Sequence, residues 1–284
     1  MSIQTADTNA AHPTSVCSRT GTDRLFWLCL WIIAGTYILL IMAMILADAS
    51  FTSPWHLWQA LDSPYIRYSI WLSLISCTAT MILSVWVSVP IGYLLSRYDF
   101  RGKNLVDAVL DIPIVLPPLV IGLSLLILFQ TVFGKFIENH IMRFTYEVSG
   151  VILAQFTVAC AFAVRTMRAT FESTDRRHEH VALTLGCSQS QAFWLVIIPE
   201  ARRGILTAAT LAWARAMGEF GPILIFAGAT RLRTEVLPTT VFLELSVGNI
   251  EAAVAVSLIM VISAVLVLLV VRFFGLHQAT EKMV

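Results

Sequence analysis

Long apolar runs separated by shorter polar stretches set the pattern of this chain. Six segments are apolar over about 20 residues or more, which is the length needed to cross the hydrocarbon of a bilayer. They are residues 25–47, 69–96, 105–129, 148–167, 204–227 and 250–274. The pattern predicts an all-α, polytopic membrane protein with six transmembrane helices.

The two ends of the chain are predicted to be polar tails. Residues 1–24 are polar and rich in Ser and Thr, without apolar periodicity, which predicts a disordered cytoplasmic tail. Residues 276–284 form a second, short tail, and residues 65–275 hold the core. The run at 25–47 is too long for the apolar part of a signal peptide, so we expect a retained first span. An Ala-Asp-Ala sequence that begins at its last residue, Ala47, imitates a cleavage site and keeps the alternative open.

Lys and Arg are distributed unevenly between the two sides of this arrangement. If the N-terminus is cytoplasmic, thirteen of the 19 Lys and Arg residues fall on the inner side and five on the outer side, while Arg215 lies within a span. Cytoplasmic loops of membrane proteins carry the excess of these residues. The bias predicts that both termini are cytoplasmic. It also places the longest inner connection, residues 168–203, in the cytoplasm.

The composition fits a membrane protein and excludes several other classes. The chain is 57% hydrophobic and 13% charged, against about 25% charged residues in an average soluble domain. The net charge of +1 gives no sign of nucleic acid as a partner, and membrane lipid is the predicted surrounding. The five cysteines have no metal-type spacing, and no Walker-type phosphate loop is present. We expect no catalytic residue, metal or cofactor in this chain, and any ATP must be bound by a partner.

One polar segment, HVALTLGCSQSQAFWLVIIPE at 180–200, interrupts the apolar pattern in the predicted cytoplasmic connection. Two short amphipathic helices are predicted, because apolar residues recur at helical spacing on either side of Gly186. They are Val181, Ala182 and Leu185 in the first helix and Phe193, Val196 and Ile197 in the second. Gly186 supplies the sharp turn, and Pro199 is predicted to end the second helix. The apolar faces either fold back on the protein or bind a partner.

The same segment resembles the signature of the membrane subunits of bacterial ABC importers. In that signature, Glu-Ala-Ala, three residues and Gly, with Pro thirteen positions later, mark the loop that enters a groove of the ATPase subunit. The matching positions here are Ala182, Gly186, Phe193, Ile197 and Pro199. His180 stands where the signature has its glutamate, and Glu179 lies one place earlier. The resemblance implies that residues 178–200 form an ATPase-coupling loop.

Two further segments are similar to the molybdate, tungstate and sulfate permeases. Residues 111–129 resemble their third span, and residues 213–228 followed by 234–245 resemble their fifth span and the outer segment after it. The resemblance implies a type I ABC importer-like permease fold in a bacterial inner membrane, with molybdate or tungstate ahead of sulfate as the solute. The implied partners are a pair of ATPase subunits, an extracytoplasmic solute-binding protein and a second copy in a homodimer. Permeases for thiamine, iron and phosphonates share much of the pattern, so the solute stays open.

The third predicted span carries residues that are costly to place in lipid. They are Asp107, Asp111, Pro113, Pro117 and Pro118. Each proline leaves a carbonyl group of the preceding turn without its usual partner, and such backbone is tolerated at membrane depth where protein or water satisfies it. We expect this span to line the translocation pathway. The alternative is a proline kink that serves only helix packing.

The fifth predicted span contains an intramembrane charge pair. Arg215 and Glu219 are four residues apart and therefore share one helical face. An unpaired arginine at this depth costs about 3 kcal/mol, so we expect Arg215 to pair with Glu219, or with Asp111 if the third and fifth spans touch. The pair is either a structural clamp or a cation offered to a passing oxyanion. Gly218, Gly221 and Pro222 loosen the helix around and after Glu219, and we place a bend or gate there.

Two other classes of protein remain as alternatives. An ion-coupled secondary transporter would use the intramembrane carboxylates, but the chain has no evident inverted repeat. A membrane-embedded enzyme would need a catalytic constellation, which the His and Cys residues do not form. A transport subunit without enzymatic activity is therefore the prediction.

Overall fold

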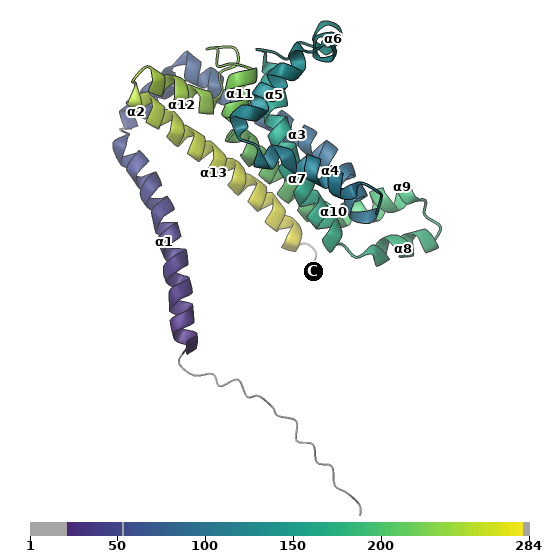
Figure 1. The fold of residues 1–284 in the computed structure, drawn as a ribbon. Coiled ribbons are helices and arrows are strands. Elements are labelled where there is room, and N and C mark those ends of the chain that lie inside the picture. The colour runs from purple at the N-terminus through teal and green to yellow at the C-terminus, as the bar shows by residue number, and fades with distance from the viewer. Residues whose placement is uncertain (1–21, 53, 281–284) are drawn as a thin grey trace, which may run out of the picture. The chain divides into compact units, whose positions relative to one another are not determined.

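The computed structural model describes residues 22–52 and 54–280 (Figure 1). The predicted tails at 1–24 and 276–284 lie largely outside these residues. The chain divides into two compact units, Met1–Ser50 and Phe51–Val284, and the second holds the helices discussed below. All elements found in the described residues are helical, as the sequence predicted.

Fourteen helical elements follow one another along the described residues. They are α1 (Thr22–Phe51), α2 (Pro54–Asp62), α3 (Pro64–Arg97), α4 (Lys103–Val115), α5 (Pro118–Gln130), α6 (Val132–His140), α7 (Val148–Ser173), α8 (Arg176–Thr184), α9 (Gln189–Ala192), the π-helix η1 (Phe193–Ile197), α10 (Ile198–Met217), α11 (Gly221–Phe226), α12 (Leu237–Ser246) and α13 (Ile250–Thr280).

Four single helices within the described residues are long and apolar enough to cross a membrane. They comprise Leu25–Phe51, Pro64–Arg97, Val148–Ser173 and Ile250–Leu269. The bent pair of α4 and α5 makes a fifth crossing if it is counted as one span. The residues predicted as the fifth span, 204–227, are instead divided between α10 and α11, which are separated by a break at 218–220.

The predicted continuous span at 105–129 is wrong in one respect, because α4 and α5 meet at an angle of 113°. Leu116 and Pro117 both have extended backbone, with ψ of 142° and 136°. A residue that precedes a proline is pushed out of the helical region, and here each of the two precedes one. Pro118 then starts α5, where its fixed φ suits a first helical position. The two adjacent prolines therefore turn a predicted kink into a break, and Pro117 itself is exposed.

The core of the second unit is a bundle of α3, α7 and α10 (Figure 1). A stripe of small residues along α3 faces this bundle: Ser69, Ser73, Ser76, Thr80, Ser84, Ser88, Gly92 and Ser96. Small side chains let helix backbones approach closely in a membrane. A Cβ on Gly92 would lie 2.8 Å from Met167 Cβ and 2.9 Å from the Arg168 backbone nitrogen. Ala208, Ala212 and Ala216 of α10 are also buried, and their small side chains allow the same close approach of helices.

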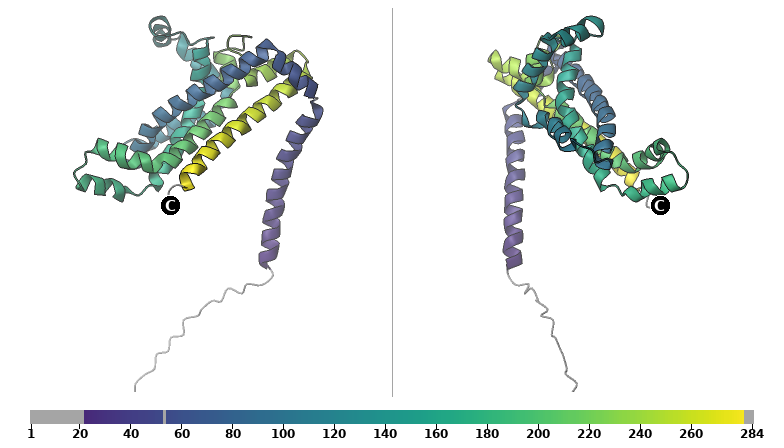
Figure 2. Two further views of the ribbon diagram at one scale, coloured as in Figure 1. Left: turned by 180° about the vertical axis from the view of Figure 1, so that it is seen from behind. Right: turned by 45° about the vertical axis from the view of Figure 1, so that its right-hand side comes forward.

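Several short helices lie at the two ends of the bundle. α8 and α9 lie at the end where α3 and α7 finish, whereas α2, α6, α11 and α12 lie at the opposite end (Figures 1 and 2). The predicted coupling loop and the break between α10 and α11 are therefore separated by the length of α10.

Candidate functional site

Glu179 joins the start of α8 to the end of α3. Asp175 caps α8, because its carboxylate accepts a hydrogen bond from the Arg177 backbone N–H at 2.9 Å. One turn later, the Glu179 carboxylate accepts a 2.6 Å hydrogen bond from the Tyr93 hydroxyl and lies 3.3 Å from Arg97 Nε. The side chains of Arg97 and Glu179 are 6% and 14% exposed, so water screens their interaction only weakly. The acidic residue of the predicted coupling loop is thus held by the chain's own α3.

Two further contacts fix the same corner. Arg176 Nη2 donates a hydrogen bond to the Ser96 carbonyl at 2.7 Å, and both Nη atoms of Arg97 lie 3.3 Å from the Thr174 carbonyl that accepts their hydrogen bonds. These are carbonyl groups at the C-terminal ends of α3 and α7, which have no partner within their helices. The corner between α7 and α8 and the end of α3 therefore form one connected unit.

Gly186 makes the turn between α8 and α9. Its φ is +92°, in the left-handed region, and no atom lies within 4 Å of the position that a Cβ would occupy. A side chain here has room but strains the backbone. The predicted contact residues divide into two groups, since Ala182, Phe193 and Ile197 pack inward while His180 and Pro199 are exposed.

Four large apolar side chains near this turn are exposed. They are Val181, Leu185, Trp194 and Leu195, of which Leu185 is 81% exposed. The sequence prediction missed Trp194 and Leu195, because it followed the stripe that packs inward. The sequence could have indicated them, because Trp194 and Leu195 lie on the side of the helix opposite to Phe193 and Ile197. These four side chains and His180 are therefore accessible to a partner protein.

Pro199 does not end a helix, contrary to the prediction. α9, η1 and α10 run from Gln189 to Met217 without a break. In the π-helical stretch hydrogen bonds span five residues, as from the Ile198 N–H to the Phe193 carbonyl. Pro199 then falls in the first turn of α10, where a missing N–H is tolerated. The second half of the coupling loop and α10 are therefore one continuous helix.

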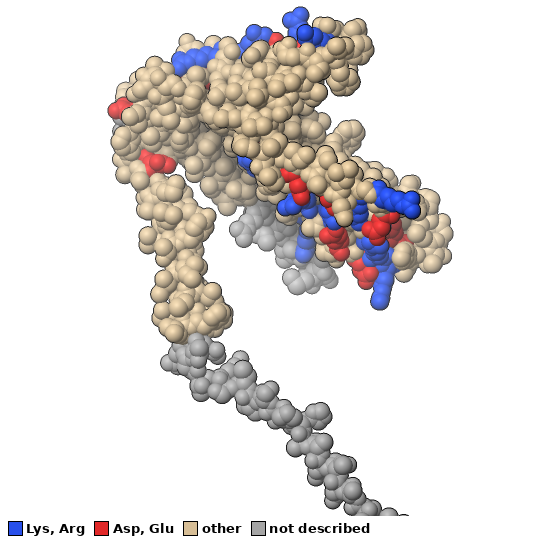
Figure 3. All heavy atoms as spheres, in the orientation of Figure 1, with Lys and Arg blue, Asp and Glu red and all other residues tan. Residues whose placement is uncertain are grey.

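Ion pairs join α4 to α7. Arg165 Nη2 lies 2.7 Å from Asp111 Oδ2, and Arg168 Nη1 lies 2.5 Å from Asp107 Oδ1. Arg168 Nε also contacts Glu172 at 2.8 Å. Figure 3 shows acidic and basic side chains mixed at this end of the molecule, while most of the visible surface is uncharged. The two aspartates of the third predicted span thus face cations of α7.

Arg215 pairs with Glu219, the first of the two predicted partners. Arg215 Nη2 lies 2.8 Å from Glu219 Oε1, in an ion pair without an aligned hydrogen bond. The second predicted partner, Asp111, is occupied by Arg165 instead. The Glu219 side chain is 1% exposed and that of Arg215 is 32% exposed, and the Arg215 guanidinium lies 5.4 Å from the centroid of the Phe162 ring. One partner is buried and the other reaches the surface of this chain.

The two helix breaks meet at Gly221. A Cβ on Gly221 would lie 3.0 Å from the Leu119 backbone nitrogen and 3.0 Å from Pro118 Cβ. A Cβ on Gly122 would lie 2.9 Å from Pro222 Cα. Glycine at both positions lets the backbones of α5 and α11 approach closely. The structure thus brings together Pro118 of the predicted pathway and Gly221 of the predicted gate, from breaks in different helices.

Gln155 is a polar residue in the core that the sequence prediction missed. It is 1% exposed. Its amide oxygen accepts a hydrogen bond from Thr80 at 3.2 Å, and its Nε2 donates one to the Ala216 carbonyl at 3.2 Å. It therefore ties α3, α7 and α10 together at a carbonyl that lies between Arg215 and Glu219 in the sequence. The sequence does indicate it, because Gln155 is an amide side chain within the apolar run of residues 148–167.

Glu235 is a second missed residue, in the segment before α12. Its side chain is buried, and neither carboxylate oxygen has a hydrogen-bond partner. Burial raises the pKa of this carboxyl, and the nearby Thr240 hydroxyl and Arg231 oppose the shift. A buried group of this kind favours its neutral form.

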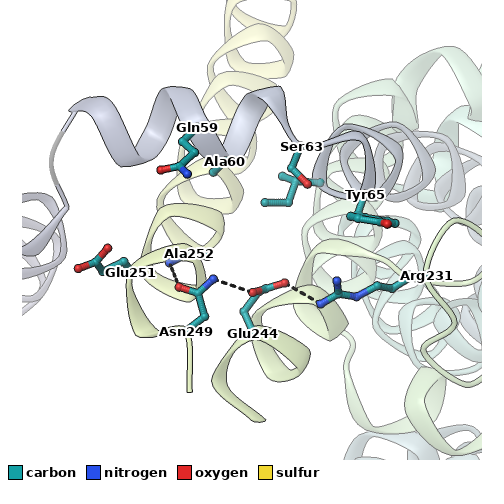
Figure 4. Close-up of a pocket in the computed structure, with 10 residues that line it drawn as sticks. Gln59, Ala60, Ser63, Tyr65, Arg231, Glu244, Asn249, Glu251 and Ala252 are labelled. Atoms are coloured by element: carbon teal, nitrogen blue, oxygen red, sulfur yellow. Dashed lines mark hydrogen bonds and ion pairs between the residues drawn. The ribbon is translucent and has the colours of Figure 1, made fainter. Parts of the chain in front are cut away.

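A polar cavity of about 400 Å³ opens at the same end (Figure 4). Glu244 binds Arg231 at 2.9 Å and Asn249 at 3.1 Å, and the Arg231 guanidinium lies 5.1 Å from the centroid of the Tyr65 ring. These contacts connect α12 with α3 and with the start of α13. The charged groups of Arg231 and Glu244 therefore satisfy one another.

Metal ligation has no candidate in the described part of the chain, where no three His, Cys, Asp or Glu side chains converge. His178 Nδ1 instead contacts Glu200 at 2.8 Å.

The geometry defines a class of helical membrane protein with two linked features. The coupling loop continues directly into α10. The break after α10 packs against the break between α4 and α5. The chain matches the family of binding-protein-dependent transport system inner membrane components over residues 88–279. It belongs to this family and is an inner-membrane protein. The predicted membership is confirmed.

Several relatives have established names. The chain is 38% identical over 169 residues to the molybdate/tungstate transport system permease protein WtpB of Pyrococcus abyssi. This match covers 60% of this chain and 64% of WtpB. It is 32% identical over 251 residues to the molybdenum transport system permease protein ModB of Mycobacterium tuberculosis, with coverage of 87% and 94%. It is 29% identical over 213 residues to the sulfate transport system permease protein CysT of Escherichia coli, with coverage of 74% and 77%.

A solved structure has the same fold. It is a bacterial alginate ABC transporter in complex with an alginate pentasaccharide-bound periplasmic protein. The TM-score is 0.70 at 14% identity, and the match covers 91% of this chain and 96% of that one.

Proposed function

We propose that this chain is the permease subunit of an ABC importer for a tetrahedral oxyanion, with molybdate or tungstate ahead of sulfate. The names of the relatives support this solute class, above all the relative that matches along 87% of this chain. The observation that carries the mechanism is the continuous helix from Gln189 to Met217. It joins the coupling loop directly to the break at which α10 and α11 separate.

The proposal uses six spans with both termini in the cytoplasm. α4 with α5 forms the third span and α10 with α11 forms the fifth, each broken in the way that transporters allow where backbone lines a cavity or is buried in protein. The coupling loop then lies in the cytoplasm, as the distribution of Lys and Arg favours. α2, α6 and α12 lie on the outer side.

The partners follow from the two ends of the molecule. A pair of ATPase subunits binds ATP and receives the apolar tip around Gly186, where Leu185, Trp194 and Leu195 are exposed. An extracytoplasmic solute-binding protein delivers the oxyanion to the outer end. A second copy of the chain completes the pore.

Transport is alternating access driven by the ATPase. Closure of the ATPase subunits moves the tip, and Glu179 and Arg176 make α3 follow it. Because α9, η1 and α10 are continuous, the same displacement reaches the contact between Gly221 and Pro118. Rigid helices that move about a few break residues are the usual hinge and shear mechanism.

In this mechanism the Arg215–Glu219 pair is a clamp. Glu219 is buried and would be costly without its cation. The clamp fixes the last turn of α10, so that motion is concentrated at the break after it. The 32% of the Arg215 side chain that is exposed adds positive potential at the surface of this chain.

Reconstitution tests the proposal. Vesicles that hold the chain with its ATPase and binding protein are expected to accumulate molybdate or tungstate only with ATP, and sulfate is expected to compete more weakly. Vesicles that hold the chain alone are the control. Accumulation by the chain alone under an ion gradient would overturn the proposal in favour of a secondary transporter, whereas ATP-driven uptake of another solute would change only the substrate.

A further inference from the structure

α6 is a short helix outside the membrane spans. It has nine residues, Val132–His140, and at 1.5 Å per residue it is about 14 Å long, too short to cross a bilayer. It directly follows α5, at the end of the molecule opposite α8 and α9 (Figures 1 and 2). It therefore begins where the third predicted span leaves the membrane.

The start of α6 is fixed against the end of α5. Thr131 caps the helix, since its hydroxyl oxygen accepts a hydrogen bond from the Gly134 N–H at 3.2 Å. The Thr131 O–H group donates a hydrogen bond to the Leu128 carbonyl at 2.6 Å. A Cβ on Gly134 would lie 2.3 Å from both the Leu128 oxygen and Phe129 Cα. This close approach determines which side of α6 faces the protein.

The end of α6 is fixed as well. The Glu138 carboxylate accepts hydrogen bonds from the backbone N–H groups of Thr145 at 2.8 Å and Phe144 at 3.4 Å. Burial raises the pKa of Glu138, but the hydrogen bonds from Thr145 and Phe144 outweigh it, and the pKa is lowered overall. The helix is therefore held at both ends and cannot roll freely.

The outward surface of α6 is divided into an apolar and a polar side. Gly134, Ile137 and Glu138 face the protein. On the exposed surface, successive residues are 100° apart, so Val132, Phe133 and Phe136 fall on one side and Lys135 and Asn139 on the other. The exposed His140 ring also falls on the first side, where it stacks on Phe136 with ring centroids 4.4 Å apart. Val132 is 89% exposed and Phe133 is 65% exposed. Beyond the helix, Ile141 and Met142 extend the apolar side, and Arg143 adds a second exposed cation.

A second helix at this end presents large aromatic residues. Trp55 and Trp58 of α2 are both exposed. Tryptophan is enriched at the level where membrane and water meet. Lys and Arg side chains are also visible at the end of the molecule that carries α6 (Figure 3). These features indicate that this end lies at the depth of the lipid headgroups.

We infer that α6 is an interfacial anchor that lies in the plane of the outer membrane surface and binds anionic phospholipid headgroups. Val132, Phe133 and Phe136 enter the boundary between headgroups and acyl chains, which is how amphipathic interfacial helices bind. Lys135 and Arg143 reach the phosphates, and the attraction falls off within a Debye length. The inference needs only the membrane location, not the transported solute.

The anchor has a consequence for the break in the third span. α6 is rigidly attached to α5, and α5 packs on α11 through Gly122 and Gly221. If α6 is held at the membrane surface, the depth of α5 in the membrane and its tilt are fixed as well. When α10 moves, α11 is then displaced relative to α5, which α6 and the lipid hold in place.

Photo-crosslinking tests where the apolar side lies. Benzoylphenylalanine is placed at Phe133, at Lys135 and, as a lipid-facing control, at Trp71 of α3, which is 67% exposed. The full chain is reconstituted in vesicles of phosphatidylcholine and phosphatidylglycerol and adducts are identified by mass spectrometry. Lipid adducts are expected at Phe133 and Trp71, and fewer at Lys135, which lies at the level of the phosphates and not of the acyl chains. A covalent dimer at Phe133 would show that a second copy covers α6, and absence of any adduct there while Trp71 labels would place it in water; either result overturns the inference.

Charge neutralisation tests the headgroup. In mixed vesicles the adduct at Phe133 is expected to be enriched in phosphatidylglycerol over its share of the lipid. The enrichment is expected to be lost in the double variant Lys135→Gln and Arg143→Gln, while Lys103→Gln, at the other end of the molecule, leaves it unchanged. Equal enrichment in the neutralised variant would overturn the assignment of the two cations. No ATPase is present, so failure of the transport proposal does not affect this result.

Discussion

The bundle of α3, α7 and α10 and the pair of broken helices around α5 and α11 are both packed backbone to backbone, but in different ways. In the bundle, small residues run along the whole of α3, and Gln155 ties the three helices together. Around α5 and α11, close contact is limited to the glycines at two helix breaks. A long seam resists relative motion along its length, whereas a contact at two breaks can change by rotation about few residues. The bundle is therefore the stiffer region, and the breaks are where the helices can rotate relative to one another.

The largest effect is expected from a side chain placed in the long seam. Gly92→Val puts a Cβ within 3.0 Å of the Met167 and Arg168 backbone, which cannot move without separating α3 from α7. Overpacking of this kind costs about 3 kcal/mol, so folded yield after detergent extraction is expected to fall sharply. Size-exclusion chromatography measures it. Gly218→Ala is the control, because the nearest atom to a Cβ on Gly218 would be 3.8 Å away. Equal losses of folded yield in both variants would contradict the tight packing of α3 on α7 at Gly92.

The next effect is expected at the charged pair, where the two regions join. Arg215→Ala leaves Glu219 buried without a cation, and we expect a loss of about 2 kcal/mol, reduced from the value for a fully buried pair because Arg215 is partly exposed. A lower thermal midpoint in detergent is the measurement. The double variant Arg215→Ala and Glu219→Gln is expected to recover part of the stability. An unchanged midpoint with lost transport would show that the arginine serves the solute and not the fold.

A different result is expected at the breaks, because Gly221 is less enclosed than Gly92. Gly221→Ala needs a shift of a few tenths of an ångström at Leu119 and Pro118, which costs about 1 kcal/mol. Solute uptake is expected to fall at least tenfold while ATP hydrolysis by the partner continues. Hydrolysis and uptake are measured in the same vesicles. If both fall in proportion to the folded yield, Gly221 has only a packing role.

The sequence predicted the bundle better than the breaks. Long apolar runs, the turn at Gly186 and the Arg215–Glu219 pair depend on local spacing, which a sequence displays directly. The angle of 113° between α4 and α5 was beyond it, because prolines indicate a break and not its direction.

The remaining differences come from partners that are distant in sequence. Asp111 meets Arg165 across 54 residues and Glu179 meets Tyr93 across 86, and no local pattern contains such pairs. The continuity of α10 through Pro199 was also missed, because the π-helical stretch before it has no sequence signature that we could apply.

The smallest effect on stability is expected where the coupling loop joins the bundle. Glu179→Gln keeps an acceptor for the Tyr93 hydroxyl but removes the charge that faces Arg97, and we expect a loss of about 1 kcal/mol or less. Coupling is expected to suffer more than stability, since α8 can then move without α3. The ratio of solute transported to ATP hydrolysed is the measurement, and it is expected to fall. His180→Gln tests the alternative, because His180 is exposed in the coupling loop and has no part in the contact with α3. If His180→Gln lowers the ratio and Glu179→Gln does not, the loop drives transport through its outer surface alone and α3 is not part of the moving unit.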